Sequence, residues 1–177
     1  MTADPSADVT LGEDLVAAAV LRGQFVLRSG KTSAYYIDKF LFITRPALLK
    51  RLAAQLARRM PADTQRVAGQ VLGAAQLAAG VSLETGLPSL LVRTEKKEYG
   101  TAKAIEGELR PGDRVVVVED VVTTGGAALA AVASLRNAGA EVLGVVAAID
   151  REEGGAAAFA AAGVPYQALF TKSQLGL

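Results

Sequence analysis

Short apolar runs alternate along the chain with longer segments of helical periodicity. Residues 115–118 are four consecutive valines, which suit a strand of a parallel sheet that is covered on both faces. After Pro46, the residues Leu48, Leu52 and Leu56 recur at helical spacing, so a helix there buries one of its faces. The alternation of the two patterns predicts an α/β fold.

The predicted elements follow one another in the order of a doubly wound sheet. Strands are expected at 66–68, 88–93, 115–118, 142–149 and 166–170, and helices at 72–84 and 126–137, with a short Ala-rich helix before the last strand. Before residue 66, the pattern predicts a helix that starts with a capping box at Thr10 and a hairpin of strands 25–27 and 35–37. The polar segment 94–107 predicts a surface loop and a candidate lid.

Composition narrows the class of protein. The 177 residues, 51% of them hydrophobic, predict one domain over 1–177. The formal net charge of +1 gives no long-range field for nucleic acid or a membrane surface. Neither a membrane-spanning run nor a signal-peptide pattern is found in the sequence, so we expect a cytoplasmic protein without nucleic-acid or membrane partners.

The chain contains neither cysteine nor histidine. Their absence excludes thiol nucleophiles, Ser-His-Asp catalysis and the usual zinc sites. Carboxylates, lysines, arginines and backbone dipoles remain for the chemistry, which suits a reaction that depends mainly on charge stabilisation.

The strongest candidate site follows the valine run. Glu119 and Asp120 stand at the carboxyl end of the predicted strand, where ligands of open α/β sheets collect. Residues 123–126, Thr-Thr-Gly-Gly, then lead into an Ala-rich helix, whose first backbone N–H groups favour an anion. The order predicts a ribose-phosphate site; the alternative is a solvated strand end before a glycine turn.

This segment resembles the type I phosphoribosyltransferases. The resemblance implies their fold, a doubly wound, mainly parallel sheet flanked by helices, with a small N-terminal hood built from about residues 1–40 and the C-terminal segment. It also implies that Glu119 and Asp120 hold the ribose hydroxyls and act in catalysis. The loop that would wrap the phosphate of phosphoribosyl pyrophosphate comprises Val121, Val122, Thr123, Thr124, Gly125, Gly126 and Ala127.

Four further segments resemble orotate phosphoribosyltransferases. In the first, residues 25–38, the resemblance assigns Arg28 to the diphosphate and Tyr35 and Tyr36, with Thr123, to the base. Aromatic faces can stack on a planar pyrimidine, and a guanidinium can hold an anion. Two tyrosines in a strand can equally be packing residues.

The second segment, residues 93–101, resembles the family's catalytic loop. It assigns Arg93 and Lys97 to the developing charge of pyrophosphate, with Lys96 and Tyr99 as further contacts. Thr94 stands where many members carry a second lysine. Since the family's loop commonly reaches the partner's site, the resemblance implies a homodimer that shares residues 94–107. A solvated charge cluster is the alternative.

The third and fourth segments concern the base and the diphosphate. In residues 150–155, Arg151 would pair with the carboxylate of orotate through two parallel hydrogen bonds; the alternative is an arginine paired with Glu152 or Asp150. Residues 68–75 lie where the family keeps its pyrophosphate loop, which assigns Leu72 and Gly73 to this substrate. Gly73 takes a position where many relatives have a lysine.

Together these segments imply a magnesium-dependent orotate phosphoribosyltransferase. It would join orotate to phosphoribosyl pyrophosphate, giving orotidine 5′-phosphate and pyrophosphate in pyrimidine biosynthesis. Mg²⁺ would be bound mainly through substrate oxygens, with no metal site of the protein's own. Two alternatives remain: a purine or other base phosphoribosyltransferase, and a non-catalytic RNA-binding regulator with the same fold.

Overall fold

The computed structural model describes residues 5–26, 30, 32–93 and 104–177. The strands are β1 (Val20–Val26), β2 (Thr32–Ile37), β3 (Arg66–Gln70), β4 (Ser89–Val92), β5 (Ile105–Glu106), β6 (Arg114–Val122), β7 (Glu141–Asp150) and β8 (Tyr166–Thr171). The helices are α1 (Pro5–Ala19), α2 (Lys39–Ile43), α3 (Pro46–Ala57), α4 (Gly73–Thr85), α5 (Gly126–Asn137) and α6 (Gly155–Ala161). Within these residues no helix has the length and apolar character needed to cross a lipid bilayer.

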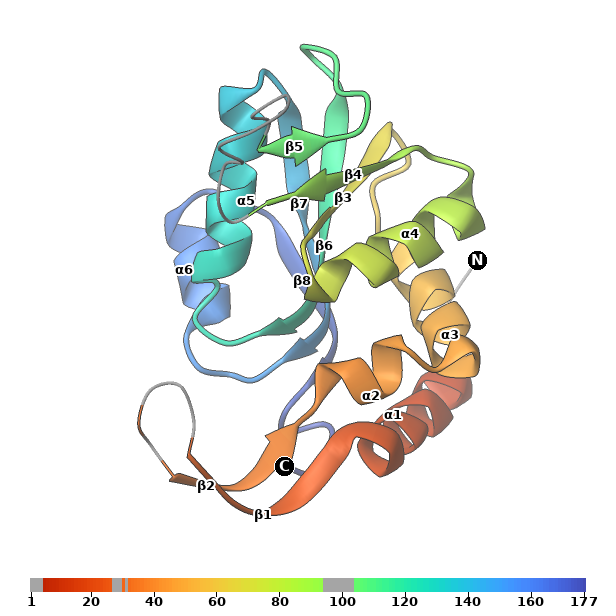
Figure 1. Cartoon of the computed structure of the whole chain (residues 1–177), viewed down its shortest axis with the longest axis vertical. Coiled ribbons are helices and arrows are strands. Elements are labelled where there is room, and N and C mark those ends of the chain that lie inside the picture. Colours follow the sequence, from red (N-terminus) through yellow and green to blue (C-terminus); the bar gives the residue numbers. More distant parts are fainter. Residues whose placement is uncertain (1–4, 27–29, 31, 94–103) are drawn as a thin grey trace.

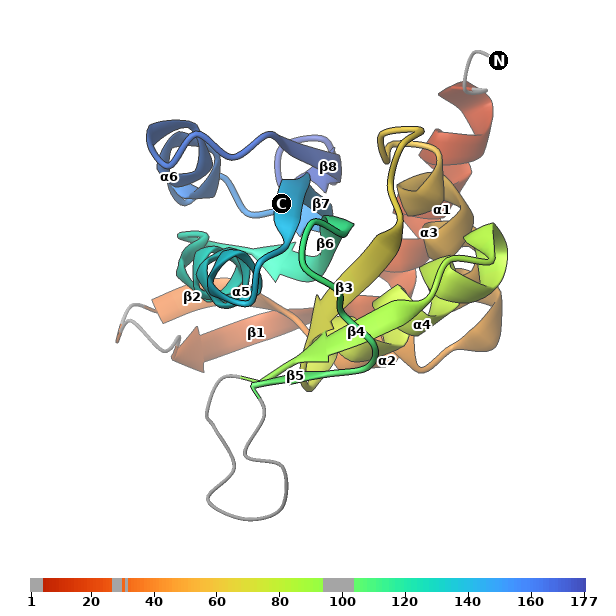
Figure 2. The ribbon, with the colours of Figure 1, turned by 90° about the horizontal axis from the view of Figure 1, so that it is seen from above.

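The main sheet has the strand order β5-β4-β3-β6-β7-β8. Its neighbouring strands are parallel except for the short edge strand β5, which pairs antiparallel with β4. Helices cover both faces, with α5 and α6 on one side and α3 and α4 on the other (Figures 1 and 2). This arrangement confirms the predicted doubly wound, mainly parallel sheet.

The core lies on both faces of the sheet because successive side chains of a strand point to opposite faces. In β6, Val116 and Val118 pack with buried residues of α1 to α4. Val115 and Val117 pack with the buried residues of α5 and α6. All four valines are fully buried, which confirms the inference that this strand is covered on both sides.

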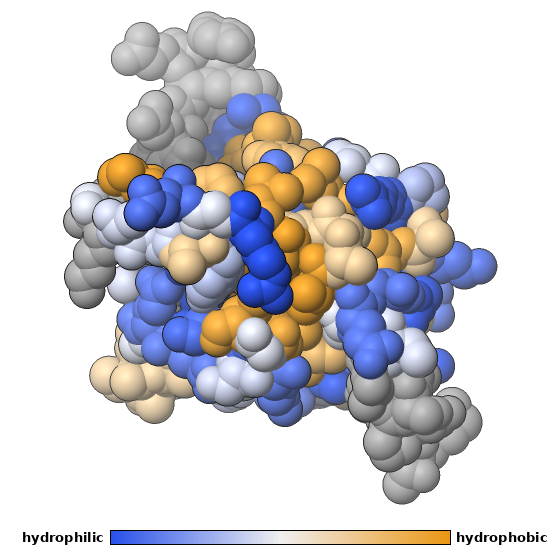
Figure 3. Space-filling model, turned by 90° about the horizontal axis from the view of Figure 1, so that it is seen from below, coloured by the Kyte–Doolittle hydropathy of each residue, from blue (hydrophilic) through white to orange (hydrophobic). Residues whose placement is uncertain are grey.

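The β1–β2 hairpin stands apart from the main sheet (Figure 1). Apolar side chains form a band across this end of the molecule (Figure 3). The large apolar residues exposed on the hairpin and α2 are Leu21, Val26, Tyr36 and Phe40. That residues 1–40 and the C-terminal segment form a hood over a base within one domain stays a prediction.

In the first half of the chain one local prediction is wrong and one helix was missed. Helix α1 already begins at Pro5, so Thr10 lies inside it and is no cap. Helix α2 was not predicted, because its five residues are too few to show a helical period; Asp38 caps it by accepting a hydrogen bond from the N–H of Phe40 (3.0 Å).

The polar segment 94–107 is not loop throughout. Its residues 105–106 form β5 and pair with β4, because the free edge of β4 offers backbone partners that the polar composition conceals. Residues 94–103 of the predicted lid lie outside the described residues.

Candidate functional site

The acidic pair sits at the carboxyl end of β6, in the middle of the sheet. Glu119 and Asp120 are 6% and 1% exposed. Their carboxylates accept hydrogen bonds from the strand's own backbone: Glu119 Oε1 from the Asp120 N–H (3.0 Å), and Asp120 Oδ1 from the Val121 N–H (2.6 Å). One oxygen of Glu119, Oε2, is buried without a hydrogen-bond partner in the structure. The pair therefore keeps acceptor capacity for a ligand.

Burial sets the protonation of this pair. Loss of water around Glu119, and then the negative charge of Asp120, raise the pKa of Glu119 to about 8. A carboxyl group with that pKa carries its proton at neutral pH in the free protein. It can then donate as well as accept a hydrogen bond, which suits hydroxyl groups of a sugar.

The loop after the acidic pair forms a small pocket. Its volume is about 160 Å³, and the lining residues are Glu119 and Val121 to Ala128. Gly125 adopts φ +79°, a left-handed conformation that suits glycine, and α5 begins directly after it. Gly125 also provides no side-chain cap for the helix, so the first N–H groups of α5 are available to an anion. The structure thus brings together the predicted loop residues.

Lys39 joins this site from α2, and sequence reasoning missed it. Its Nζ lies 2.8 Å from Asp120 Oδ2, and the side chains are 37% and 2% exposed. The predicted Gly73, the first residue of α4, lies against the same pair, since a Cβ atom there would collide with both Asp120 Oδ2 and Lys39 Nζ. No local pattern in the sequence could have indicated a contact between residues so distant along the chain.

Two other predicted substrate residues, Leu72 and Arg93, lie in different surroundings. Leu72 precedes α4 and is largely exposed, so its side chain is available at the surface beside Gly73. Arg93 follows β4 and its Nε lies 3.3 Å from Glu106 Oε1. Its role at the pyrophosphate stays a prediction. Four other predicted residues, Arg28, Lys96, Lys97 and Tyr99, lie outside the described residues.

The arginine predicted to recognise the base directly follows the next parallel strand, β7, which ends at Asp150. Asp150 is buried, and its Oδ1 accepts a hydrogen bond from the Glu152 N–H (2.7 Å), which fixes the turn. The Arg151 side chain is 12% exposed and its Nη2 lies 2.9 Å from Glu153 Oε1. Its Nε is buried without a hydrogen-bond partner in the structure. Arg151 is thus paired at its turn, but with Glu153 and not with the two acids considered from the sequence.

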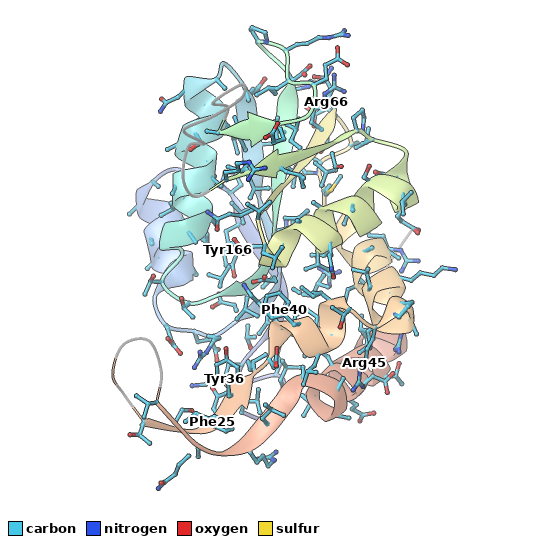
Figure 4. All side chains as sticks on the ribbon, in the orientation of Figure 1. Phe25, Tyr36, Phe40, Arg45, Arg66 and Tyr166 are labelled. Carbon is cyan, nitrogen blue, oxygen red and sulfur yellow. The ribbon has the colours of Figure 1, made fainter. Side chains whose placement is uncertain are left out.

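The two tyrosines of the hairpin point to different environments. The guanidinium carbon of Arg151 lies 5.9 Å from the centre of the Tyr35 ring. Tyr36 is 44% exposed, and its ring centre lies 5.7 Å from that of Phe25 (Figure 4). Since neighbouring residues of a strand face opposite ways, only Tyr35 is brought to Arg151. The assignment of Tyr36 to the base gains no support from this geometry.

The turns after β6 and β7 touch each other. The Arg151 N–H donates a hydrogen bond to the Val122 carbonyl oxygen (2.9 Å). Gly155, at the start of α6, packs so closely that a Cβ atom would collide with Val122 and lie 2.8 Å from the Thr123 carbonyl oxygen. The arginine and the loop pocket are therefore held as one unit.

The donors at this site suit a cation that is shared with a substrate. Among the described residues there is no cluster of three or more acidic side chains that could hold a metal ion alone. Glu119 and Asp120 nevertheless supply two carboxyl groups, one with an unpartnered oxygen, and Glu119 would release its proton on binding a cation. Mg²⁺ is commonly held by one or two carboxylates together with substrate phosphates, so these residues fit it.

Comparisons with known proteins show the family of this chain. The family model of the phosphoribosyl transferase domain matches residues 45–158. An orotate phosphoribosyltransferase of Halobacterium salinarum is 48% identical over 168 residues, covering 92% of this chain and 95% of that protein. One from a Nocardioides species is 45% identical over 168 residues, covering 95% and 94%.

Solved structures of orotate phosphoribosyltransferases are similar to this chain in fold and sequence. The Mycobacterium tuberculosis orotate phosphoribosyltransferase in complex with 5-phospho-α-D-ribosyl 1-diphosphate is 34% identical, with a TM-score of 0.79 and coverage of 97% of this chain and 99% of that chain. The Leishmania donovani adenine phosphoribosyltransferase, 19% identical with a TM-score of 0.68, shares the fold alone. The chain belongs to the orotate phosphoribosyltransferase family.

Proposed function

We propose that this chain transfers the ribose 5-phosphate of phosphoribosyl pyrophosphate to orotate, releasing orotidine 5′-phosphate and pyrophosphate in pyrimidine biosynthesis. The observation that carries the proposal is the position of Arg151. Its guanidinium lies beside the Tyr35 ring, and Arg151 directly follows β7, the strand that pairs with the strand of the acidic pair. A cation beside an aromatic face suits a planar base that carries a carboxylate.

The β6 turn would hold the ribose 5-phosphate. Its pocket is lined by small residues and by the start of α5, so backbone N–H groups and the helix dipole can bind the phosphate. Glu119 and Asp120, directly before the pocket, would bind the two ribose hydroxyls. The unpartnered Oε2 of Glu119 supplies one of the acceptors for them.

The β7 turn would hold the base. A guanidinium binds a carboxylate through two parallel hydrogen bonds, which a neutral base could not accept. The Nε of Arg151 has no hydrogen-bond partner in the structure, and Nη2 contacts Glu153. One oxygen of the orotate carboxylate would therefore accept a hydrogen bond from Nε. The other oxygen would replace Glu153 at Nη2.

The reaction moves charge in two directions. The bond between the anomeric carbon and the diphosphate breaks while the orotate ring nitrogen approaches, so positive charge grows on the sugar and negative charge on the leaving pyrophosphate. The carboxylates at the ribose lie on the side of the positive charge, and Arg93 and Lys97 would meet the negative charge. Glu119 and Asp120 would help substrate oxygens to hold Mg²⁺, whose charge would offset that of the diphosphate.

The proposal also covers the oligomeric state and the cellular location of the enzyme. A homodimer in which residues 94–107 are shared between subunits, and a cytoplasmic location, follow from the resemblance and the composition. Neither changes the assignment of the residues described above.

The test is turnover by the purified protein. The fall in orotate absorbance is followed with phosphoribosyl pyrophosphate and Mg²⁺, while pyrophosphate release is measured with adenine, hypoxanthine and uracil. Turnover confined to orotate supports the proposal. Turnover only with another base would overturn the role of Arg151, and binding of RNA without any turnover would favour a regulator.

A further inference from the structure

The ion pair with Asp120 leaves the ammonium group of Lys39 partly exposed. Its Nζ lies 2.8 Å from Asp120 Oδ2 and 5.8 Å from the centre of the Phe40 ring. An ammonium group has three N–H donors, and the side chain is 37% exposed whereas that of Asp120 is 2% exposed. The charge therefore lies at the surface of the acidic site, where a ligand can reach it.

Gly73 makes room for this charge. A Cβ atom on residue 73 would fall on Lys39 Nζ and on Asp120 Oδ2, so a larger residue would have to displace one of them. The ammonium group thus lies against the first residue of α4. A lysine from α2 occupies the space that a side chain of α4 would otherwise take.

The start of α4 is itself suited to an anion. The helix has 13 residues, and Leu72, its N-cap, forms no side-chain hydrogen bond with the first turn. Uncapped backbone N–H groups at the start of a helix attract negative charge. A cation in contact with this turn, beside two buried acids, makes a place where a phosphate group can bind within reach of the ribose site.

We infer that Lys39 is a further substrate-binding residue, whose ammonium group and the first turn of α4 together hold the diphosphate of phosphoribosyl pyrophosphate. The inference rests on the proposed function, because it places this diphosphate next to the ribose bound at Glu119 and Asp120. Lys39 of α2 would then provide a positive charge at a place where Gly73, which has no side chain, provides none. A merely structural role, in which Lys39 only holds Asp120, is the alternative.

Two ligands separate these roles. Inorganic pyrophosphate and ribose 5-phosphate are each titrated calorimetrically, with Mg²⁺ present, into the wild type, Lys39→Met and Lys50→Met. Lys50 is an exposed lysine of α3 and serves as the matched control. Lys39→Met keeps the apolar stem and removes the charge.

Pyrophosphate affinity should fall about ten- to hundredfold in Lys39→Met, since a hydrogen bond from a charged donor is lost. Ribose 5-phosphate affinity should stay within about twofold, because Lys39 is inferred to contact the diphosphate and not the ribose or its 5-phosphate. Unchanged pyrophosphate affinity, or an equal loss for both ligands, would overturn the inference in favour of the structural role. Lys50→Met should leave both affinities unchanged.

A second variant protects the test against misfolding. Lys39→Gln keeps a hydrogen-bond donor for Asp120 without the charge and should show the same loss of pyrophosphate affinity, whereas Lys39→Arg should restore most of it. A Lys39→Gln protein that binds pyrophosphate like the wild type would contradict the inference. Neither ligand contains a base, so a wild type that binds both but does not turn over orotate refutes the proposed function and leaves this inference standing.

Discussion

The turns that follow β6 and β7 are neighbours with a common plan and different chemistry. Each strand has a buried acid within its last three residues, Asp120 in β6 and Asp150 in β7. Each turn then has a glycine with positive φ, Gly125 or Gly154, as the residue before a helix. The β6 turn lines a pocket with backbone groups, while the β7 turn presents the largely buried side chain of Arg151.

The difference matches what each turn would recognise. Backbone N–H groups at a helix start suit a phosphate, whose oxygens accept hydrogen bonds from many directions. A guanidinium suits a planar carboxylate and rejects bases that lack one. The same arrangement, a strand followed by a glycine turn and a helix, can therefore bind anions in general through its backbone N–H groups. It can also recognise one particular group through a single side chain.

Pushing the two turns apart should have the largest effect on the loop pocket. In Gly155→Ala the new Cβ atom would collide with Val122 and the Thr123 carbonyl, so the loop pocket must shift although residue 155 belongs to the other turn. Overpacking of this kind costs about 1–3 kcal/mol, and ribose 5-phosphate affinity measured by calorimetry should fall about tenfold or more.

The neighbouring Gly154 supplies the control. A Cβ atom there would have open space around it, and its φ is +99°. Asparagine tolerates positive φ better than most residues, so Gly154→Asn should keep nearly the wild-type affinity. Equal losses in both variants would show that contact between the turns does not support the pocket.

The second prediction concerns buried charge at the β6 turn. Burial and Asp120 raise the pKa of Glu119 from its ordinary 4.5 to about 8. The folded protein therefore binds this proton more tightly than the unfolded chain does, so the stabilisation is complete below pH 4.5 and is lost as pH rises to about 8.

Thermal denaturation, measured from pH 5 to pH 9 in steps of about one pH unit, tests whether stability falls as pH rises. The wild type should lose stability relative to Glu119→Gln by several degrees in Tm as pH rises. Glu141→Gln, at the exposed start of β7, should instead run parallel to the wild type. Parallel curves for Glu119→Gln as well would show that Glu119 titrates normally.

The smallest effect is expected where the β7 turn is tied to the C-terminal segment. Glu152 Oε2 accepts hydrogen bonds from the Ser173 N–H (2.9 Å) and its hydroxyl. Glu152→Ala should loosen the turn that carries Arg151 and raise KM for orotate about two- to tenfold, with little change in KM for phosphoribosyl pyrophosphate. The exposed Glu84→Ala on α4 serves as control; equal changes in both KM values for Glu152→Ala would argue against a link confined to the base.

Sequence patterns predicted the features that depend on neighbouring residues. The valine run of β6, the acidic pair and the glycine turn into α5 are all consecutive, so periodicity and turn chemistry suffice. The two-residue β5 needed the free edge of β4 and was missed. The ion pair of Lys39 with Asp120 and the contact of Arg151 with Glu153 depend on tertiary packing or on one rotamer, and no local pattern encodes these.

The preference of the enzyme for orotate over uracil shows whether Arg151 recognises the base. The values of kcat/KM for orotate and for uracil are measured in the wild type and in Arg151→Ala. The account predicts strong preference for orotate in the wild type, and loss of about ten- to hundredfold of that preference in Arg151→Ala, chiefly through a higher KM for orotate. A variant that keeps the wild-type preference would contradict the assignment of the β7 turn to the base.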